Sequence, residues 1–136
     1  MFESEFKIRV RYSETDQMGF VYYGNYAQYY EVARVEALRS IGASYKELEK
    51  SGIMMPVVQM NICFKKPAHY DDELIIKTKI SKKPDVKMQF YYEIYCDDNL
   101  LNTAETILVF VDKNTMRPCH CPEWFLDLFS GFNLLT

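Results

Sequence analysis

The chain has 136 residues, a formal net charge of −3 and 49% hydrophobic residues, a balance typical of one globular domain rather than a disordered segment. A nucleic-acid-binding protein needs a basic surface for phosphate contacts, and this charge argues against one. The most apolar run, Ile107–Val111, is far too short to span a bilayer, and the N-terminus does not resemble a signal peptide. We therefore expect one domain over residues 1–136 in a cytoplasmic protein, with no transmembrane segment and no nucleic-acid partner.

The first elements are a strand and a loop. Apolar residues alternate with charged ones over Phe6–Tyr12, which predicts a strand with one buried face. A polar loop, Ser13–Gly19, follows and leads into the aromatic cluster Phe20–Tyr23. Within this loop, Glu14 is expected to face solvent rather than to orient its neighbours.

A long helix is predicted over residues 26–41 from apolar residues at three- and four-residue steps. This apolar stripe consists of Tyr26, Tyr30, Ala33, Ala37 and Ile41. The charged residues fall off the stripe and are expected on the polar face: Glu31, Arg34, Glu36 and Arg39. Asn25 and Gln28 form a predicted capping pair, and Gly42 is expected to end the helix.

The rest of the chain is predicted to form a short helix, four strands and a tail helix. Ser44 and Glu47 have capping-box spacing, and the short helix should stop near Gly52. Alternation then predicts strands over about 58–65, 74–80, 86–94 and 100–112. The tail helix begins near Pro122 and should place these side chains on one side: Trp124, Phe125, Leu128 and Phe129.

This order of elements predicts an α+β fold in which a long helix packs on a five-stranded antiparallel sheet. The second face of the sheet carries aromatic residues, including Tyr91 and Tyr95. A surface of this kind usually contacts a partner, so we expect a homodimer at least.

The four cysteines are expected to be reduced thiols, because no export signal precedes them. The segment Cys119-His120-Cys121 lacks the four suitably spaced ligands of a structural zinc site, so a turn is predicted there. We expect neither a metal nor a cofactor.

Asp16 is the residue most suited to chemistry, because it precedes the start of the long helix by a few positions. The first N–H groups of a helix have no internal acceptor and favour negative charge. A carboxylate beside them can bring a nucleophile or a water molecule to a carbonyl group, while the N–H groups stabilise the oxyanion. On spacing alone, a structural role for Asp16 in the turn is the favoured interpretation.

A resemblance to a known family changes that balance. The segment Glu14-Thr15-Asp16-Gln17-Met18-Gly19-Phe20-Val21-Tyr22-Tyr23-Gly24-Asn25-Tyr26 resembles the signature of the 4-hydroxybenzoyl-CoA thioesterase group of hotdog proteins, in particular its YbgC-like branch. Further matches are Glu31-x-Ala33-Arg34, Lys66-Pro67-Ala68, Asp71-Asp72-Glu73-Leu74 and Asn102-x-Ala104-Glu105. The resemblance covers roughly residues 5 to 118.

The resemblance implies a hotdog fold, in which the sheet wraps the long helix, and an acyl-CoA thioesterase whose active site lies at a subunit interface. Asp16 matches the catalytic aspartate, which either attacks the thioester carbonyl or activates water as a general base. The backbone N–H of Tyr23 matches the group that polarises the carbonyl, although many YbgC-like members carry His at this position.

Substrate contacts are expected in the signature loop and at nearby cations, because CoA carries phosphates. The residues expected to bind acyl-CoA are Gly19, Phe20, Val21, Tyr22, Tyr26, Lys82 and Lys83. Lys82 and Lys83 are expected near the CoA phosphates, with Lys65 and Lys66 as the other candidate cations. The resemblance allows either a homodimer or a homotetramer, and the sequence does not rank aryl against aliphatic acyl groups.

Two alternatives to hydrolysis remain open. One is a non-hydrolytic hotdog protein that binds acyl-carrier protein or acyl chains, since a fold does not fix a function. The other is an unrelated module that dimerises for structural reasons. A hotdog dehydratase is disfavoured, because His69 and His120 lie outside the loop before the helix.

Overall fold

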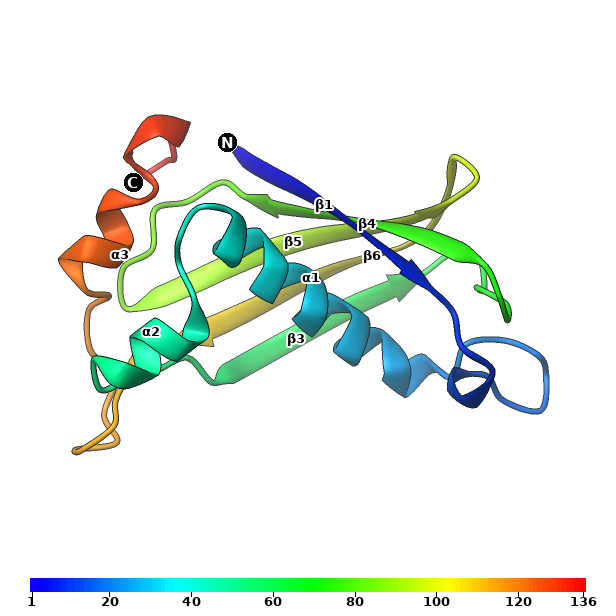
Figure 1. Ribbon diagram of the computed structural model, residues 1–136, viewed down its shortest axis with the longest axis horizontal. Helices are drawn as coiled ribbons and strands as arrows, with labels where there is room; N and C mark the ends of the chain where they lie inside the picture. Colours follow the sequence, from blue (N-terminus) through cyan, green and yellow to red (C-terminus); the bar gives the residue numbers. More distant parts are fainter.

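The computed structural model describes residues 1–136, and its main feature is a five-stranded sheet with a long helix against it (Figure 1). The strands follow the order β1-β4-β5-β6-β3, and every pair of neighbours is antiparallel. Their bounds are β1 (Phe2–Arg9), β3 (Val57–Phe64), β4 (Glu73–Ile80), β5 (Lys87–Cys96) and β6 (Asn99–Val109). The predicted α+β class and antiparallel sheet are confirmed.

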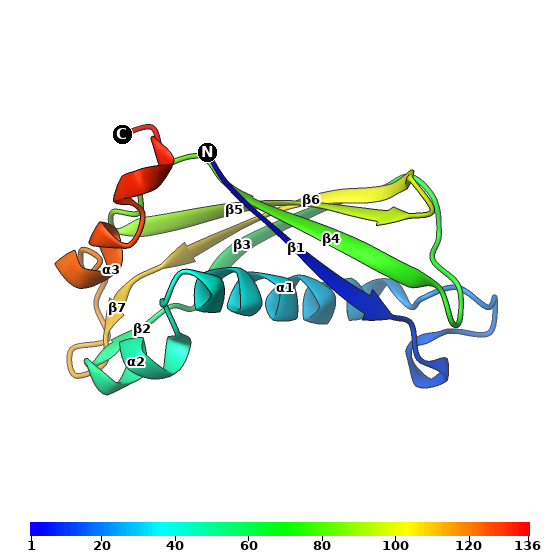
Figure 2. The same cartoon turned by 45° about the horizontal axis from the view of Figure 1, so that its top comes forward.

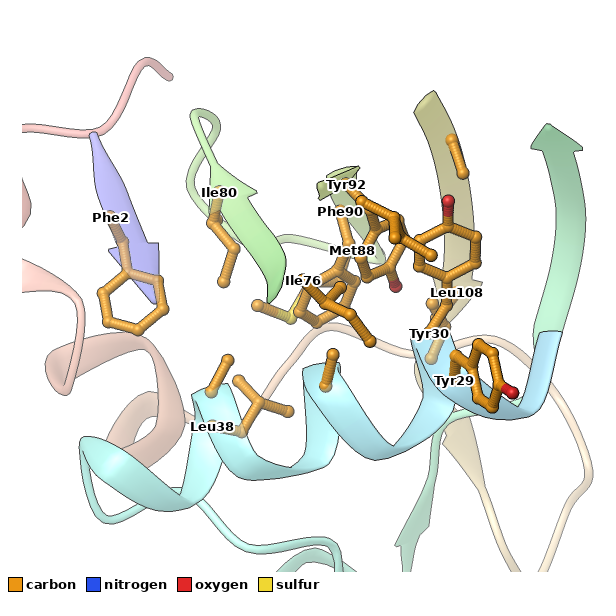
Figure 3. Packing of buried hydrophobic residues seen from close by; sticks show 14 of the residues in the cluster. Phe2, Tyr29, Tyr30, Leu38, Ile76, Ile80, Met88, Phe90, Tyr92 and Leu108 are labelled. Carbon is orange, nitrogen blue, oxygen red and sulfur yellow. The ribbon is translucent and has the colours of Figure 1, made fainter. Parts of the chain in front are cut away.

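Helix α1 (Tyr26–Ser40) lies against one face of the sheet, and the other face is uncovered in the single chain (Figure 2). Its buried residues are Tyr26, Tyr29, Tyr30, Ala33, Arg34, Ala37 and Leu38. Between this helix and the sheet, side chains from β4 and β5 fill the core, including Ile76, Met88 and Phe90 (Figure 3). Burial of each such side chain stabilises the fold by about 1.5–3 kcal/mol.

Arg34 does not follow its prediction. It was expected on the polar face of the helix, but it is only 4% exposed. The helix packs mainly on β1 and β4, so the edge of α1 that carries Arg34 is turned toward β5, where Tyr92 contacts the guanidinium. A long side chain at such an edge reaches beneath the sheet instead of toward solvent.

Strand β3 differs from the other strands because the helix does not cover it. Strands β4 and β5 show the strict alternation of buried and half-buried side chains that one covered face produces. Along β3, in contrast, Val58 is 57% exposed and Phe64 is 54% exposed. The strand is also paired on one side only, with β6, which makes it an edge strand.

The predicted boundaries hold for the helices more closely than for the first strand. Strand β1 begins at Phe2, four residues early, because this ring packs against Phe132 with centroids 5.0 Å apart. Helix α2 (Tyr45–Lys50) starts as predicted, with the Ser44 hydroxyl accepting the amide of Glu47 at 3.1 Å. Gly42 has a φ of +86°, which ends the long helix as expected.

The capping pair predicted at the start of α1 is wrong. The side chain of Asn25 accepts no hydrogen bond from the helix. Its Nδ2 instead donates to the backbone oxygen of Glu14 at 2.8 Å. Asn25 thus ties the helix start to the preceding loop, a long-range contact that helix-capping rules do not contain.

The C-terminal part contains a small sheet that the alternation did not reveal. The last long strand stops at Val109, and the chain resumes as β7 (Val111–Asp112), which pairs with β2 (Ile53–Met54). Helix α3 (Glu123–Asp127) follows Pro122 as predicted, and a turn of 3-10 helix, η3 (Ser130–Phe132), comes after it. Phe125 of α3 is buried, whereas Trp124 is 38% exposed, so the predicted common side is only partly observed. None of the helices has the length and apolar character needed to cross a bilayer.

Candidate active site

The loop between β1 and α1 holds the side chain of Asp16 in one orientation. Its Oδ1 accepts the amides of Met18 at 2.9 Å and Phe20 at 3.3 Å. The backbone of Asp16 closes the same loop, since its amide donates to the oxygen of Phe20 and its oxygen accepts from Gly19. Gly19 has a φ of +78°, which a side chain would strain. The second carboxylate oxygen, Oδ2, has no partner in the chain and is free to act on a ligand.

The start of the long helix presents two unpaired backbone donors. A 3-10 turn, η2 (Tyr23–Asn25), runs directly into α1. The amides of Asn25 and Tyr26 are satisfied by the carbonyl oxygens of Tyr22 and Tyr23. The amides of Tyr23 and Gly24 have no acceptor in the chain, and they lie at the positive end of the helix. These N–H groups are suited to bind a carbonyl oxygen or an oxyanion.

The glycine at position 24 leaves room for the side chain of Tyr22. A Cβ added there would lie 2.9 Å from the Tyr22 ring, so the ring would have to shift. The rings of Tyr22 and Tyr23 lie 4.8 Å apart, and interaction of the Tyr22 hydroxyl with that of Tyr23 raises the pKa of Tyr22.

A cavity of about 300 Å³ joins the aspartate to the helix start. It is lined by Asp16, Met18, Phe20, Val21, Tyr23, Tyr26, Phe64, Lys65, Lys66 and Pro67. The lining is mainly apolar and aromatic, with one carboxylate and two ammonium groups. It therefore combines an apolar surface with the residues that can attract a phosphate-bearing ligand.

Glu14 is buried, and the expectation that it faces solvent is wrong. Its Oε1 accepts the amide of Arg11 at 2.8 Å and the hydroxyl of Tyr29 at 2.9 Å, while its Oε2 lies 3.0 Å from the Arg11 guanidinium. Burial by itself raises the pKa of this carboxyl, but the bonds from Arg11 and Tyr29 outweigh burial and hold the pKa below its ordinary value. Because its backbone oxygen accepts the amide of Tyr22, Glu14 joins the end of β1 to the helix start.

The structure brings some of the predicted site residues together and leaves others apart. Asp16, Phe20, Val21, Tyr23 and Tyr26 line one cavity. Gly19 and Tyr22 stand beside it as part of the same loop and helix start. The two predicted lysines line a different hollow, of about 460 Å³, near the turn between β4 and β5: Lys82 and Lys83.

The two charged lining residues besides Asp16 are the pair that the sequence offered as the alternative cations, whereas Met18, Phe64 and Pro67 were not predicted. Lys65 and Lys66 stand at the end of β3, where their amides donate to the oxygen of Leu101. The strand brings them beside Asp16, which lies about 50 positions earlier in the chain. The signal for this pair was its charge beside a predicted turn, and Phe64 and Met18 had no signal.

A further hollow of about 360 Å³ lies on the uncovered face of the sheet. Two of its charged groups pair with each other, since the ammonium group of Lys79 lies 2.7 Å from the carboxylate of Glu93, and Glu105 accepts a hydrogen bond from Gln89. It shares no lining residue with the cavity of Asp16. The cavity at the helix start is therefore the better candidate for chemistry.

Comparison with known proteins adds to this geometry. Residues 10–129 match the thioesterase-like superfamily. YneP of Bacillus subtilis, named for a proposed acyl-CoA thioesterase activity, is 36% identical, and the match covers 97% of this chain and 96% of YneP. The acyl-CoA thioester hydrolase YbgC of Escherichia coli is also 36% identical, over 85% of this chain and 87% of YbgC. The structure of DHNA-CoA thioesterase from Staphylococcus aureus superimposes with a TM-score of 0.89 and 34% identity, over 96% of this chain and 91% of that one.

Proposed function

The chain belongs to the thioesterase-like superfamily and is an acyl-CoA thioesterase of the hotdog fold, and from this premise we propose that Asp16 drives hydrolysis of the thioester. One observation carries the proposal. The free Oδ2 of Asp16 and the unpaired amides of Tyr23 and Gly24 belong to the same loop and helix start, and Asp16 and Tyr23 line the same cavity. This arrangement supplies a carboxylate that can act as base or nucleophile and two N–H donors that can polarise a carbonyl group.

In this proposal the thioester oxygen accepts hydrogen bonds from the amides of Tyr23 and Gly24, which stabilise the negative charge that develops on it. Asp16 then acts by one of two routes. As a base, it takes a proton from water while the hydroxide oxygen bonds to the acyl carbon and the carbon–sulfur bond breaks. As a nucleophile, its Oδ2 forms a mixed anhydride and releases CoA thiolate, and water hydrolyses the anhydride.

The test is hydrolysis of an acyl-CoA panel that contains short, long and aromatic acyl groups, with release of free thiol as the readout. We expect turnover on at least one class. If a well-folded oligomer hydrolyses none of them, the alternative function is favoured, namely a hotdog protein that binds acyl-carrier protein or acyl chains. The name of the Staphylococcus aureus relative makes aromatic CoA esters the first members to assay.

We further propose that the active form is a homodimer or a homotetramer whose subunits join through β3. Its free edge has unpaired backbone donors and acceptors, and its exposed apolar side chains need cover. A second β3 would extend the sheet and close the cavity beside Phe64. A tetramer would use the uncovered sheet face in addition. We also propose that the protein acts in the cytoplasm and that residues 1–136 form a single domain.

The variant Val58→Asp is expected to dissociate the oligomer, because Val58 is 57% exposed on β3 in the single chain and an unpaired buried carboxylate is costly. Sedimentation velocity measures the oligomeric state. The matched control is Val32→Asp on the outer side of α1, where Val32 is 40% exposed. A Val58→Asp protein that sediments like the wild type would rule out the β3 interface.

The nucleotide phosphates require cations, and two lysine pairs are proposed for them. Lys65 and Lys66 line the cavity of Asp16 in the same chain. Lys82 and Lys83 line a separate hollow and serve only if another subunit supplies them. We expect the double change of Lys65 and Lys66 to Ala to raise KM about tenfold with little change in kcat, because both side chains are exposed and an exposed ion pair contributes about 0.2–1 kcal/mol.

Steady-state kinetics on the CoA ester and on the matching acyl-pantetheine, which lacks the nucleotide, measure this effect. The rise in KM should appear with the CoA ester alone. The same double change at Lys82 and Lys83 is the matched comparison. A rise in KM confined to that second variant would instead indicate that the CoA phosphates bind at the hairpin after β4.

A further inference from the structure

The peptide oxygen of Glu14 accepts two hydrogen bonds, and both come from the start of the long helix. The amide of Tyr22 donates to this oxygen at 2.9 Å, and the side-chain Nδ2 of Asn25 donates to it at 2.8 Å. A carbonyl oxygen has two lone pairs, so both of its acceptor positions are filled. These two bonds form a clamp that holds the chain at positions 22 and 25.

The two backbone donors proposed to bind the thioester oxygen lie between the clamped positions. The amides of Tyr23 and Gly24 have no acceptor in the chain, whereas the amide of Asn25 donates to the oxygen of Tyr22 at 2.9 Å. Because the residues on both sides of the free amides are bonded to one oxygen atom, the direction of these two N–H groups depends on the clamp.

The same oxygen belongs to the segment that carries Asp16. Glu14 lies two positions before Asp16 and is only 6% exposed. Its carboxylate accepts the hydroxyl of Tyr29 at 2.9 Å, and the amide of Asp16 donates to the oxygen of Phe20 at 2.8 Å, so the segment is held on both sides. The clamp therefore connects a fixed segment that carries the carboxylate of Asp16 to the free amides of the helix start.

An ordinary capping role does not account for the side chain of Asn25. A capping residue accepts a hydrogen bond from an amide of the first turn, and the side chain of Asn25 accepts none. It uses the donor half of its amide instead. Asp and Ser cap helices about as well as Asn does, but an ionised Asp has no donor for a carbonyl oxygen. The clamp therefore requires a property of Asn that capping does not.

We propose that Asn25 is a positioning residue for thioester hydrolysis. Its bond to the Glu14 oxygen holds the two free amides of the helix start in the orientation toward Asp16 that the developing oxyanion requires. Preorganised donors lose much of their effect when they are misplaced, and a shift of about 1 Å lowers a rate by about 100-fold. This inference rests on the proposed thioesterase function and adds the residue that sets the geometry of its site.

The first test is Asn25→Ala, which removes the side-chain bond of the clamp and keeps the bond from the Tyr22 amide. We expect kcat to fall by about 10- to 100-fold and KM to change by less than about threefold, because donors to the oxyanion act mainly in the transition state. The matched control is Asn99→Ala. The Nδ2 of Asn99 also donates to a peptide oxygen, that of Asp97 at 3.2 Å, but in an exposed turn outside the cavity. This control should keep the wild-type kcat.

Asn25→Asp separates positioning from helix capping. A carboxylate at the N-terminus of a helix stabilises the helix, so a capping role predicts an unchanged or higher urea midpoint together with unchanged activity. Positioning predicts a stable fold with a loss of kcat at least as large as in Asn25→Ala, because the carboxylate repels the Glu14 oxygen and adds negative charge beside the oxyanion. If Asn25→Ala does not fold, this variant provides the test.

Infrared spectroscopy of a bound ester reports on the donors themselves. The probe is the CoA ester with the highest turnover in the panel, labelled with ¹³C at the thioester carbonyl and bound to Asp16→Asn. Hydrogen bonds from the free amides weaken the carbonyl bond, so its stretching frequency should lie below the value in water. Addition of Asn25→Ala should return the frequency toward that value, and addition of Asn99→Ala should leave it low.

The outcomes separate this inference from the function beneath it. A folded Asn25→Ala protein with the wild-type kcat overturns the role of Asn25 and leaves the thioesterase in place. A low kcat with an unchanged carbonyl frequency also overturns it, because the loss then arises away from the oxyanion donors. A wild type that hydrolyses no CoA ester overturns the proposed function, and the inference with it.

Discussion

The variant Asp16→Asn is expected to lower kcat for acyl-CoA hydrolysis by about 10²- to 10⁴-fold without unfolding the protein. Asn retains a carbonyl oxygen that can accept the amides of Met18 and Phe20, which now bond to Oδ1 at 2.9 and 3.3 Å. The loop should therefore keep its shape. What the variant lacks is the negative charge and the free second oxygen that the mechanism needs. Thiol release measures kcat, and urea unfolding verifies the fold.

The matched control is Asp98→Asn, which removes the same charge from an exposed turn. Asp98 has a φ of +65°, a conformation that Asn tolerates well. The Asp98→Asn variant should hydrolyse the substrate at the wild-type rate. If Asp16→Asn shows comparable turnover, the assignment of Asp16 is wrong, although the fold and the family are unaffected.

Isotope labelling separates the two routes open to Asp16. In water enriched with ¹⁸O, the general-base route places the label in the released acid and leaves the protein unlabelled. A mixed anhydride gives water a second carbon to attack, and attack there labels the carboxylate of Asp16. Mass spectrometry of the peptide that contains Asp16, after many turnovers, therefore tests for the covalent route.

The sequence predicted those elements that depend on local periodicity. The stripe of α1 and the alternation of β4 and β5 repeat over many residues, so single exceptions did not hide them. The two-residue strands β2 and β7 have no such repeat. They exist because tertiary contacts bring Ile53–Met54 beside Val111–Asp112, and no local pattern contains that information.

The site shows the same division between local and long-range information. Asp16 and Tyr23 were predicted because they belong to one continuous signature. Lys65 reaches the same cavity only through the sheet order, and the burial of Glu14 depends on a hydroxyl from α1. Arg34 looked like a surface residue because helical spacing says which side a residue is on, but not how far the neighbouring strands extend.

The variant Glu14→Gln is expected to destabilise the fold by about 1–3 kcal/mol and to lower kcat. Gln loses the charge that balances Arg11 and places an amide N–H₂ group among donors, where the carboxylate now accepts bonds at 2.8, 2.9 and 3.0 Å. The backbone of Glu14 holds the amide of Tyr22 at 2.9 Å, next to the free donor of Tyr23. A shift of Glu14 therefore displaces the oxyanion site relative to Asp16.

The stabilising effect of Glu14 should depend on pH in one direction. Its folded pKa lies below the ordinary value of 4.5, so in acid the unfolded chain binds more protons than the folded one. Stability from this group therefore rises with pH and is fully present above the unfolded pKa. It is lost as the pH falls below about 4.5, through the lower folded pKa.

Urea unfolding of wild type and Glu14→Gln at pH 7, 4 and 3 measures this dependence. The difference in unfolding free energy should be largest at pH 7 and should shrink at each acidic step, since protonation makes the wild-type carboxyl resemble the amide. Glu47→Gln on the surface of α2 is the control and should show a small difference at every pH, because its ion pair with Lys50 spans 3.5 Å between exposed side chains. A Glu14→Gln difference that stays constant from pH 7 to pH 3 would show that packing, rather than the charge of Glu14, holds β1 to the helix start.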